Sequence, residues 1–232
     1  MNKIEKLKAE YKNKKGRIKE RLKQFQKFFN EPYSWFYRNG SLVLLHVKTE
    51  DDYRLFEELC FCIFTANTSA EMGAKAVDAV RNVLMNGSAD DMKRRLEGIY
   101  RFNNTRPSYI VHTRNYLKNS FDFKLKNKIK SFKNKNELRD FFALNKDIKG
   151  IGYKEASHFL RNIGFKEYAI LDKHIIDSLH EFGVLKTNEK PKNKQEYVEI
   201  EGKFKEFSKK INMDIGELDL LLWSRKNGRI LK

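Results

Sequence analysis

The hydrophobic positions along the chain recur mainly with the period of an α helix. Four apolar residues follow one another at steps of four, three and four, on one face of an amphipathic helix. They are Ile18, Leu22, Phe25 and Phe29. The mostly charged residues before Gly16 are expected to form a separate, frayed helix, because glycine interrupts helices.

A longer apolar stretch predicts a helix in the centre of the protein. It follows Thr49 and carries apolar residues on nearly every side between Leu55 and Phe64. Ser69 and Ser88 are each placed to cap a following helix. Further helices are predicted around residues 92–99, 108–118, 137–144, 194–210 and 215–225, with a short strand or buried extended segment at 42–47. The pattern as a whole predicts an all-α fold.

Composition adds a strong positive charge. The formal net charge is +17, from 48 Lys and Arg against 31 Asp and Glu. Contacts of such cations with phosphate supply most non-specific affinity for nucleic acid, so a polyanion is the favoured partner. A lysine-rich surface without such a partner fits the composition as well.

The cysteines and the start of the chain narrow the class of protein. Cys60 and Cys62 lie in an apolar stretch, where we expect them to be buried as small hydrophobic residues. Two cysteines cannot complete a four-cysteine zinc or iron–sulfur site, so we expect no structural metal cluster and no cofactor. No apolar run has the length of a membrane span, and the charged start has no signal region. We therefore expect a cytoplasmic protein with no membrane partner.

Residues 147–164 contain a glycine-rich turn between two predicted helices. One helix ends near Leu144, the turn uses Gly150 and Gly152, and a second helix starts near Tyr153. Glycines allow positive φ and a close approach of the backbone to another surface. The N–H groups at a helix start bind anions, and on a basic protein the expected anion is a DNA phosphate. An ordinary corner between two helices has the same pattern.

Lys154 and Asp172 are the candidate catalytic pair. Lys154 lies in the first turn of the second helix, where the positive helix end disfavours the ammonium form, and a neutral amine can attack a sugar C1′ and form a Schiff base. Asp172 follows the apolar residues 169–171 and is placed to cap the next helix. A carboxylate there can also stabilise positive charge on a sugar. A solvated surface lysine and a purely capping aspartate are the alternatives.

These residues form a recognisable signature. It consists of GIGYK at residues 150–154 and LDKH at residues 171–174. It resembles the helix-hairpin-helix and aspartate signature of the DNA glycosylase superfamily, and a lysine at this position is typical of the bifunctional members. The resemblance implies Lys154 as the nucleophile and Asp172 as the catalytic acid group, with Gly150, Gly152 and His174 at the DNA backbone.

Other segments indicate the branch of the superfamily. The chain lacks the four-cysteine cluster that is usual in the endonuclease III and adenine-glycosylase branches. Residues 61–70, 101–106 and 216–232 resemble the compact archaeal-type 8-oxoguanine DNA glycosylase/AP lyase, the second family of that activity. The resemblance covers most of the chain beyond about residue 17.

The resemblance implies further site residues. Trp223 would stack on the flipped base, Lys232 would contact it, and Asn67 would enter the gap that the base leaves. The alternatives are a core aromatic for Trp223, a frayed terminus for Lys232 and a half-buried helix histidine for His174.

The resemblance also implies a fold and a reaction. Two helical subdomains would flank a cleft: residues 1–70 with 186–232, and a barrel subdomain at 71–185 with the helix-hairpin-helix at about 138–164. The expected enzyme removes 8-oxoguanine from double-stranded DNA through a lysine Schiff base and nicks the strand by β-elimination. We expect a monomer without an obligate protein partner. An endonuclease III-like enzyme for oxidised pyrimidines and a non-catalytic DNA-binding protein remain alternatives.

Overall fold

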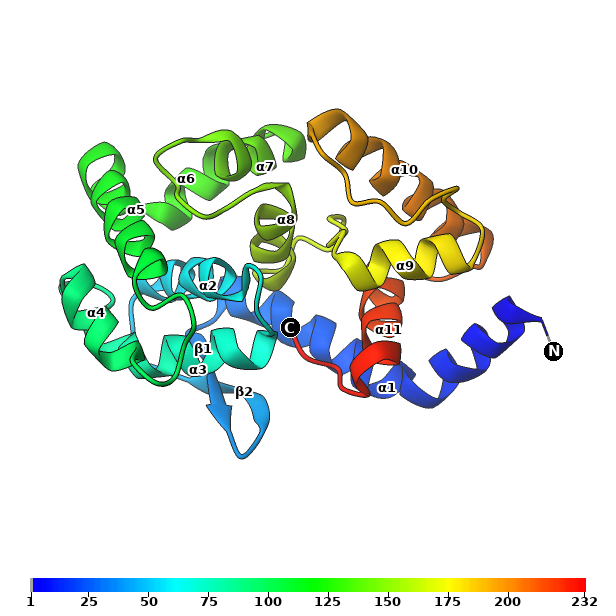
Figure 1. Cartoon of the computed structure of the whole chain (residues 1–232), viewed down its shortest axis with the longest axis horizontal. Coiled ribbons are helices and arrows are strands. Elements are labelled where there is room, and N and C mark those ends of the chain that lie inside the picture. Colours follow the sequence, from blue (N-terminus) through cyan, green and yellow to red (C-terminus); the bar gives the residue numbers. More distant parts are fainter. Residues whose placement is uncertain (1) are drawn as a thin grey trace. The chain divides into compact units, whose positions relative to one another are not determined.

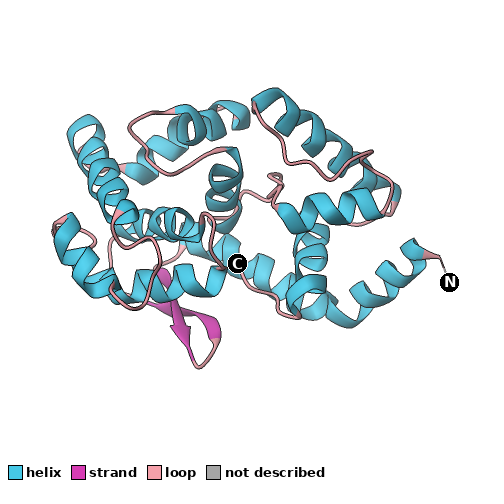
Figure 2. Cartoon of the chain, viewed as in Figure 1, coloured by secondary structure: helices cyan, strands magenta, loops and turns pink. Residues whose placement is uncertain are grey.

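The computed structural model describes residues 2–232 and is built almost entirely of helices, with one small two-stranded sheet (Figure 2). The predicted all-α class is therefore confirmed. The chain forms two compact units, one of Lys27–Phe159 and one of the residues up to Gln26 together with Leu160–Lys232. Their boundaries differ from the subdomains expected at 1–70 with 186–232 and at 71–185, and that division stays a prediction.

The unit of residues 27–159 is organised around α2. This helix packs against α3, α5 and α6, and its residues from Leu55 to Thr65 are buried except Glu57 (Figure 1). The predicted central helix is thereby confirmed, and both of its cysteines are buried and free. The elements are β1 (Tyr33–Arg38), β2 (Ser41–His46), α2 (Asp51–Thr65), α3 (Ala70–Val80), η1 (Arg81–Val83), α4 (Ala89–Leu96), α5 (Thr105–Phe121), α6 (Leu125–Ser131), α7 (Lys135–Leu144) and the start of α8 (Tyr153–Asn162).

The other unit is built around α11, which packs against α9 and α10. Four leucines in one short run of α11 are buried, so this Leu-rich helix lies in the interior of the unit. They are Leu218, Leu220, Leu221 and Leu222. The elements are most of α1 (Lys3–Asn30), the end of α8, α9 (Lys173–Glu181), α10 (Lys194–Lys210) and α11 (Ile215–Asn227).

The expected interruption of the first helix at Gly16 is wrong. α1 continues from Lys3 through Gly16, whose missing side chain faces open space. One glycine inside a helix costs only about 1 kcal/mol relative to alanine. Contacts on its N-terminal side offset this cost: the Tyr11 hydroxyl donates a hydrogen bond to Glu217, and the Lys14 ammonium donates to Ser224.

The small sheet was expected in part, and the two serine caps were expected in full. The extended segment expected at 42–47 is β2, which pairs antiparallel with the unpredicted strand β1. Ser69 and Ser88 cap α3 and α4 as predicted, each accepting a backbone hydrogen bond in the first turn. Within residues 2–232, none of the helices combines the length and the apolar character needed to cross a membrane.

Candidate active site

The predicted helix-hairpin-helix is present between α7 and α8. Phe142 and Phe159 pack edge to face, with ring centroids 4.9 Å apart. The Tyr153 hydroxyl, at the start of α8, donates a hydrogen bond to the carboxylate of Asp140 in α7. Burial and this carboxylate together raise the pKa of Tyr153, so the hydroxyl stays protonated and the bond persists. The two helices are therefore held together by one aromatic contact and one hydrogen bond.

The turn itself depends on Gly150. Its φ is +75°, and a Cβ added there would lie 2.8 Å from Cδ2 of Tyr109 and 3.0 Å from a guanidinium nitrogen of Arg106. Both reasons for a glycine therefore apply, conformation and close approach. The preceding residue is fixed as well, because the Lys149 N–H donates a 2.9 Å hydrogen bond to the buried Thr113 hydroxyl.

Gly152 has a different role from the one expected. Its φ lies outside the left-handed region, so the prediction of positive φ holds for Gly150 alone. Gly152 starts α8 instead: its carbonyl accepts a hydrogen bond from the Ala156 N–H, and its own N–H donates to Oε2 of Glu155 at 3.3 Å. This exchange fixes the first turn of α8, where Lys154 lies.

Lys154 is partly buried and has a partner. Its side chain is 29% exposed, and Nζ lies 2.8 Å from Oε1 of Glu155. Glu155 thus contacts both the amine and the turn through its two oxygens. The amine is neither sealed in the core nor extended into solvent, as a nucleophile that must reach a substrate requires.

Asp172 caps α9, as predicted. Its Oδ1 accepts a 2.9 Å hydrogen bond from the Ile175 N–H, and its carbonyl accepts the first helical bond, from Ile176. The residue is only half-buried. Its second carboxylate oxygen has no hydrogen bond to any residue of the described part of the chain, so capping leaves this oxygen available for a substrate.

The two candidate catalytic residues belong to different compact units. Lys154 lies in the unit 27–159, and Asp172 lies in the unit that contains residues 160–232. That their side chains meet around one nucleotide stays a prediction.

Asn67 lies at the tip of the loop between α2 and α3, in the same unit as Lys154. It is exposed and has a left-handed backbone with φ +62°. Asparagine adopts this conformation more readily than most other residues with a side chain, so it suits a tight turn at this point. The loop is anchored to the end of α2, because the Thr68 hydroxyl and the Tyr100 hydroxyl both donate a hydrogen bond to the carbonyl of Phe64.

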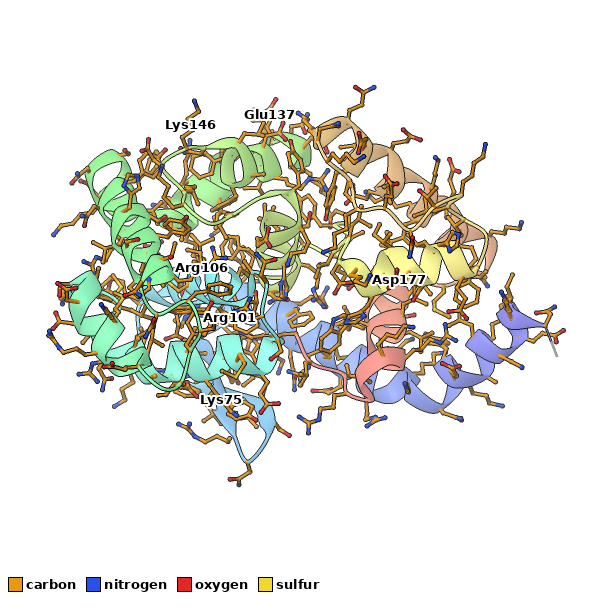
Figure 3. All side chains as sticks on the ribbon, viewed as in Figure 1. Lys75, Arg101, Arg106, Glu137, Lys146 and Asp177 are labelled. Carbon is orange, nitrogen blue, oxygen red and sulfur yellow. The ribbon has the colours of Figure 1, made fainter. Side chains whose placement is uncertain are left out.

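Arg106 joins this loop to the hairpin, a role that the sequence had not indicated. It is buried, and its guanidinium donates a 3.2 Å hydrogen bond to the carbonyl of Ala66 while lying beside Gly150. Arg101, exposed nearby, reaches the carbonyl of Asn67 at 3.4 Å (Figure 3). Both arginines belong to the 101–106 segment, which was the only available signal.

The C-terminal candidates lie in the other unit. Trp223 is half-buried in α11, so it is not a fully enclosed core aromatic. Lys232 is only 5% exposed, which contradicts a frayed terminus, and Arg21 of α1 reaches the nearby carbonyl of Ile230 at 3.4 Å. His174 is half-buried in the first turn of α9. The base-recognition and phosphate-contact roles of these residues stay predictions.

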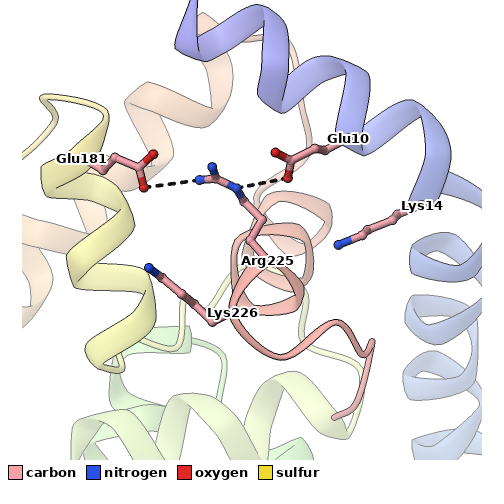
Figure 4. Close-up of a pocket in the computed structure, with 5 residues that line it drawn as sticks. All are labelled: Glu10, Lys14, Glu181, Arg225 and Lys226. Carbon is pink, nitrogen blue, oxygen red and sulfur yellow. Dashed lines mark hydrogen bonds and ion pairs between the residues drawn. The ribbon is translucent and has the colours of Figure 1, made fainter.

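A pocket of about 350 Å³ lies between α1, α9 and α11 (Figure 4). At its centre Arg225 bridges two carboxylates: Nε lies 3.1 Å from Glu10, and Nη1 lies 3.5 Å from Glu181. Lys14 and Lys226 complete the lining. Because Arg225 pairs with a carboxylate of α1 and one of α9, we interpret this cluster as a connection that holds α11 against both helices.

Comparison with known proteins identifies the family. The sequence profile described as 8-oxoguanine DNA glycosylase matches residues 44–213. The chain belongs to this family. An 8-oxoguanine DNA glycosylase/AP lyase of Korarchaeum cryptofilum is 38% identical over 186 residues, which cover 80% of this chain and 86% of the relative. One of Fusobacterium nucleatum is 33% identical and covers 100% of this chain and 97% of the relative.

A solved member of the 8-oxoguanine DNA glycosylase family shares the fold. The crystal structure of the Methanocaldococcus jannaschii 8-oxoguanine glycosylase/lyase, in complex with a 15mer DNA containing 8-oxoguanine, superimposes with a TM-score of 0.80. The two chains are 32% identical, and the match covers 99% of each. The resemblance seen in the sequence is therefore confirmed, but it is not limited to the residues beyond about 17, because the matches include the first residues as well.

Proposed function

We propose that Lys154 and Asp172 carry the chemistry of this 8-oxoguanine DNA glycosylase/AP lyase. The observation that carries the proposal is the position of Lys154: a partly exposed amine in the first turn of α8, directly after the Gly150 turn. The carboxylate of Asp172 supports it, since capping occupies only one of its oxygens.

The reaction follows from these groups. Nζ of Lys154 attacks C1′, the bond from C1′ to N9 of 8-oxoguanine breaks, and the base leaves with the electron pair and takes up a proton. Asp172 stabilises the positive charge that develops on the sugar and accepts a proton from the amine. Ring opening gives a Schiff base, and loss of a C2′ proton then expels the 3′ phosphate by β-elimination.

Binding requires the nucleotide to leave the duplex. The enzyme is proposed to bind double-stranded DNA, with the N–H groups at the hairpin, including Gly150 and Gly152, and with His174 near the phosphates. Asn67 enters the emptied stack, and the base is held by Trp223 and Lys232. The enzyme is proposed to work as a monomer, without an obligate protein partner, on DNA of the nucleoid.

Borohydride trapping tests the nucleophile. Wild-type protein should form a covalent complex with a duplex containing 8-oxoguanine, and Lys154→Gln should form none. Lys146→Gln, at an exposed lysine of the same hairpin, is the matched control and should trap normally at saturating enzyme. An undiminished yield with Lys154→Gln would reject the mechanism.

Two further experiments test the acid group and the lesion. Asp172→Asn should keep the fold and bind DNA, because asparagine caps helices as well as aspartate, but should lose most base excision. A panel of duplexes should show cleavage at 8-oxoguanine and not at thymine glycol. Efficient cleavage at thymine glycol alone would favour the endonuclease III-like alternative, and intact duplexes throughout would favour a DNA-binding protein without catalysis.

A further inference from the structure

The segment that leads to Asp172 is held by buried side chains instead of a neighbouring strand. Residues 169–171 belong to no helix or strand, and each of their three N–H groups donates a hydrogen bond to a side chain of α10 or α11. The bonds are Ala169 N–H to Glu201 Oε1 at 3.0 Å, Ile170 N–H to Asp219 Oδ1 at 3.2 Å and Leu171 N–H to the Tyr197 hydroxyl at 3.2 Å. The Tyr197 hydroxyl donates in turn to the carbonyl of Ala169 at 2.8 Å.

Two of the three acceptors are carboxylates in the interior. Glu201 and Asp219 are each 4% exposed, and Tyr197 is 3% exposed. Burying a charged acceptor costs far more than burying a hydroxyl or an amide that would accept the same N–H group. For the neighbouring N–H group of Leu171, the neutral hydroxyl of Tyr197 serves as the acceptor. The charge of Asp219 therefore calls for a further explanation.

The surroundings of Asp219 connect this charge with the site. Burial raises the pKa of Asp219 to about 6, the positive charge of Arg161 opposes the shift, and the negative charge of Asp172 adds to it. Asp219 and Asp172 are therefore close enough to feel each other's charge. Arg161 comes from the end of α8, beside the buried Asn162.

The remaining charged groups of this region are identifiable. Glu201 of α10 pairs with Lys205 at 3.1 Å, and burial together with the positive charge of Arg161 lowers the pKa of Arg21 of α1 to about 10. A step near pH 6 in the rate is assigned to Asp219 by its loss in the Asp219→Asn variant.

We propose that Asp219 is a positioning residue for Asp172: it fixes the segment that carries the catalytic carboxylate and, when ionised, strengthens the negative potential in which the sugar cation forms. This inference rests on the proposed role of Asp172. The position of the carboxylate is set through Ile170, two residues earlier, and the second negative charge makes Asp172 a better partner for a cation.

The test is Asp219→Asn in the full chain. The carboxamide oxygen can still accept the Ile170 N–H, so the fold is kept while the charge is lost. In single-turnover excision of 8-oxoguanine, the wild-type rate should rise with a midpoint near pH 6, the pKa of Asp219. The variant should lack this step and should be slower by about 10-fold at neutral pH, with an unchanged Kd for the duplex.

Tyr197→Phe is the matched control. It removes the hydroxyl bonded to Leu171 and Ala169 and leaves every charge in place. Because Tyr197→Phe weakens the support of residues 169–171 and changes no charge, it should slow excision and keep the wild-type pH profile. A profile of Asp219→Asn that matches wild type in midpoint and rate overturns the proposal.

The same assay separates this proposal from the role of Asp172. An inactive Asp172→Asn together with a fully active Asp219→Asn rejects the role of Asp219 alone. A fully active Asp172→Asn rejects the proposed catalytic carboxylate, and the positioning role with it. Loss of the pH step in Asp219→Asn, in a variant whose fold is normal by circular dichroism, supports the proposed roles of Asp219 and Asp172.

Discussion

The guanidinium of Arg106 donates a 3.2 Å hydrogen bond to the carbonyl of Ala66, and the same side chain lies beside Gly150. One buried arginine therefore holds the loop that presents Asn67 and packs against the turn that precedes Lys154. Arg106→Gln should loosen the loop and lower excision from duplex DNA by about 10- to 100-fold, because small displacements in a site are costly. Single-turnover assays on duplex and single-stranded 8-oxoguanine substrates measure the effect.

The single-stranded substrate makes this prediction specific. No partner base has to be replaced there, so the loss with Arg106→Gln should be much smaller than on the duplex. Arg94→Gln removes an exposed arginine of α4 that pairs with Asp91, and it should affect neither substrate beyond a small change in DNA affinity. Equal losses on both substrates would mean that Arg106 does not act through the Asn67 loop.

Gly150→Ala should destabilise the protein by about 2 kcal/mol or more. The new methyl group would meet the Tyr109 ring at 2.8 Å in a backbone conformation with φ +75°. Gly98→Ala is the matched control, because Gly98 has nearly the same φ, +70°, with open space around it, and should cost about 1 kcal/mol. Urea unfolding of both variants separates strain from collision. If the two lose equal stability, the close approach at the hairpin is unimportant.

Much of the fold was predictable because it depends on local patterns. The central helix α2, the serine caps and the glycine turn all follow from residues a few positions apart, and the structure confirms them. The passage of α1 through Gly16 was not predictable, because Tyr11 and Lys14 contact residues of α11 about 200 positions away. Long-range contacts outweigh a weak local propensity in this case.

The same distinction applies to the site. Lys154 and Asp172 could be proposed from the sequence, through the chemistry of their side chains and the family resemblance, and their roles stay a proposal. Arg106, Glu155 and Asp219 were missed, since an arginine or a carboxylate in a charged sequence carries no visible sign of being buried or of holding a backbone segment. Their roles depend on partners such as Ala66 and Ile170, and only coordinates reveal these.

Trp223→Leu should separate base recognition from strand cleavage. Trp223 is half-buried in α11, and stacking of an aromatic ring on a base is worth about 1–3 kcal/mol. Excision of 8-oxoguanine should therefore fall by about 10- to 100-fold, while cleavage at a preformed abasic site, which has no base to stack, should be retained. Tyr53→Leu, at an exposed aromatic residue of α2, is the control. An equal loss on abasic DNA would assign Trp223 to the structure of α11.

Asp219→Asn should make the protein more stable although it makes the enzyme slower. The pKa of Asp219 is about 6 in the folded protein and 3.8 without the fold, so the native state holds a proton more tightly than the unfolded chain. Wild-type stability due to this group is then fully present below about pH 4 and is lost as the pH rises through about 6. A shift of roughly two units corresponds to about 3 kcal/mol above that range.

Asparagine has no charge to bury, so the difference between variant and wild type isolates this contribution from all other titrating groups. The free energy of unfolding, measured in urea at several pH values, should be equal for the two proteins in acid and should favour Asp219→Asn at neutral pH. A variant less stable than wild type at neutral pH would show that the attraction between Asp219 and Arg161 outweighs the cost of burial. A gain in stability combined with a loss of excision would mean that the buried charge is retained for catalysis at the expense of the fold.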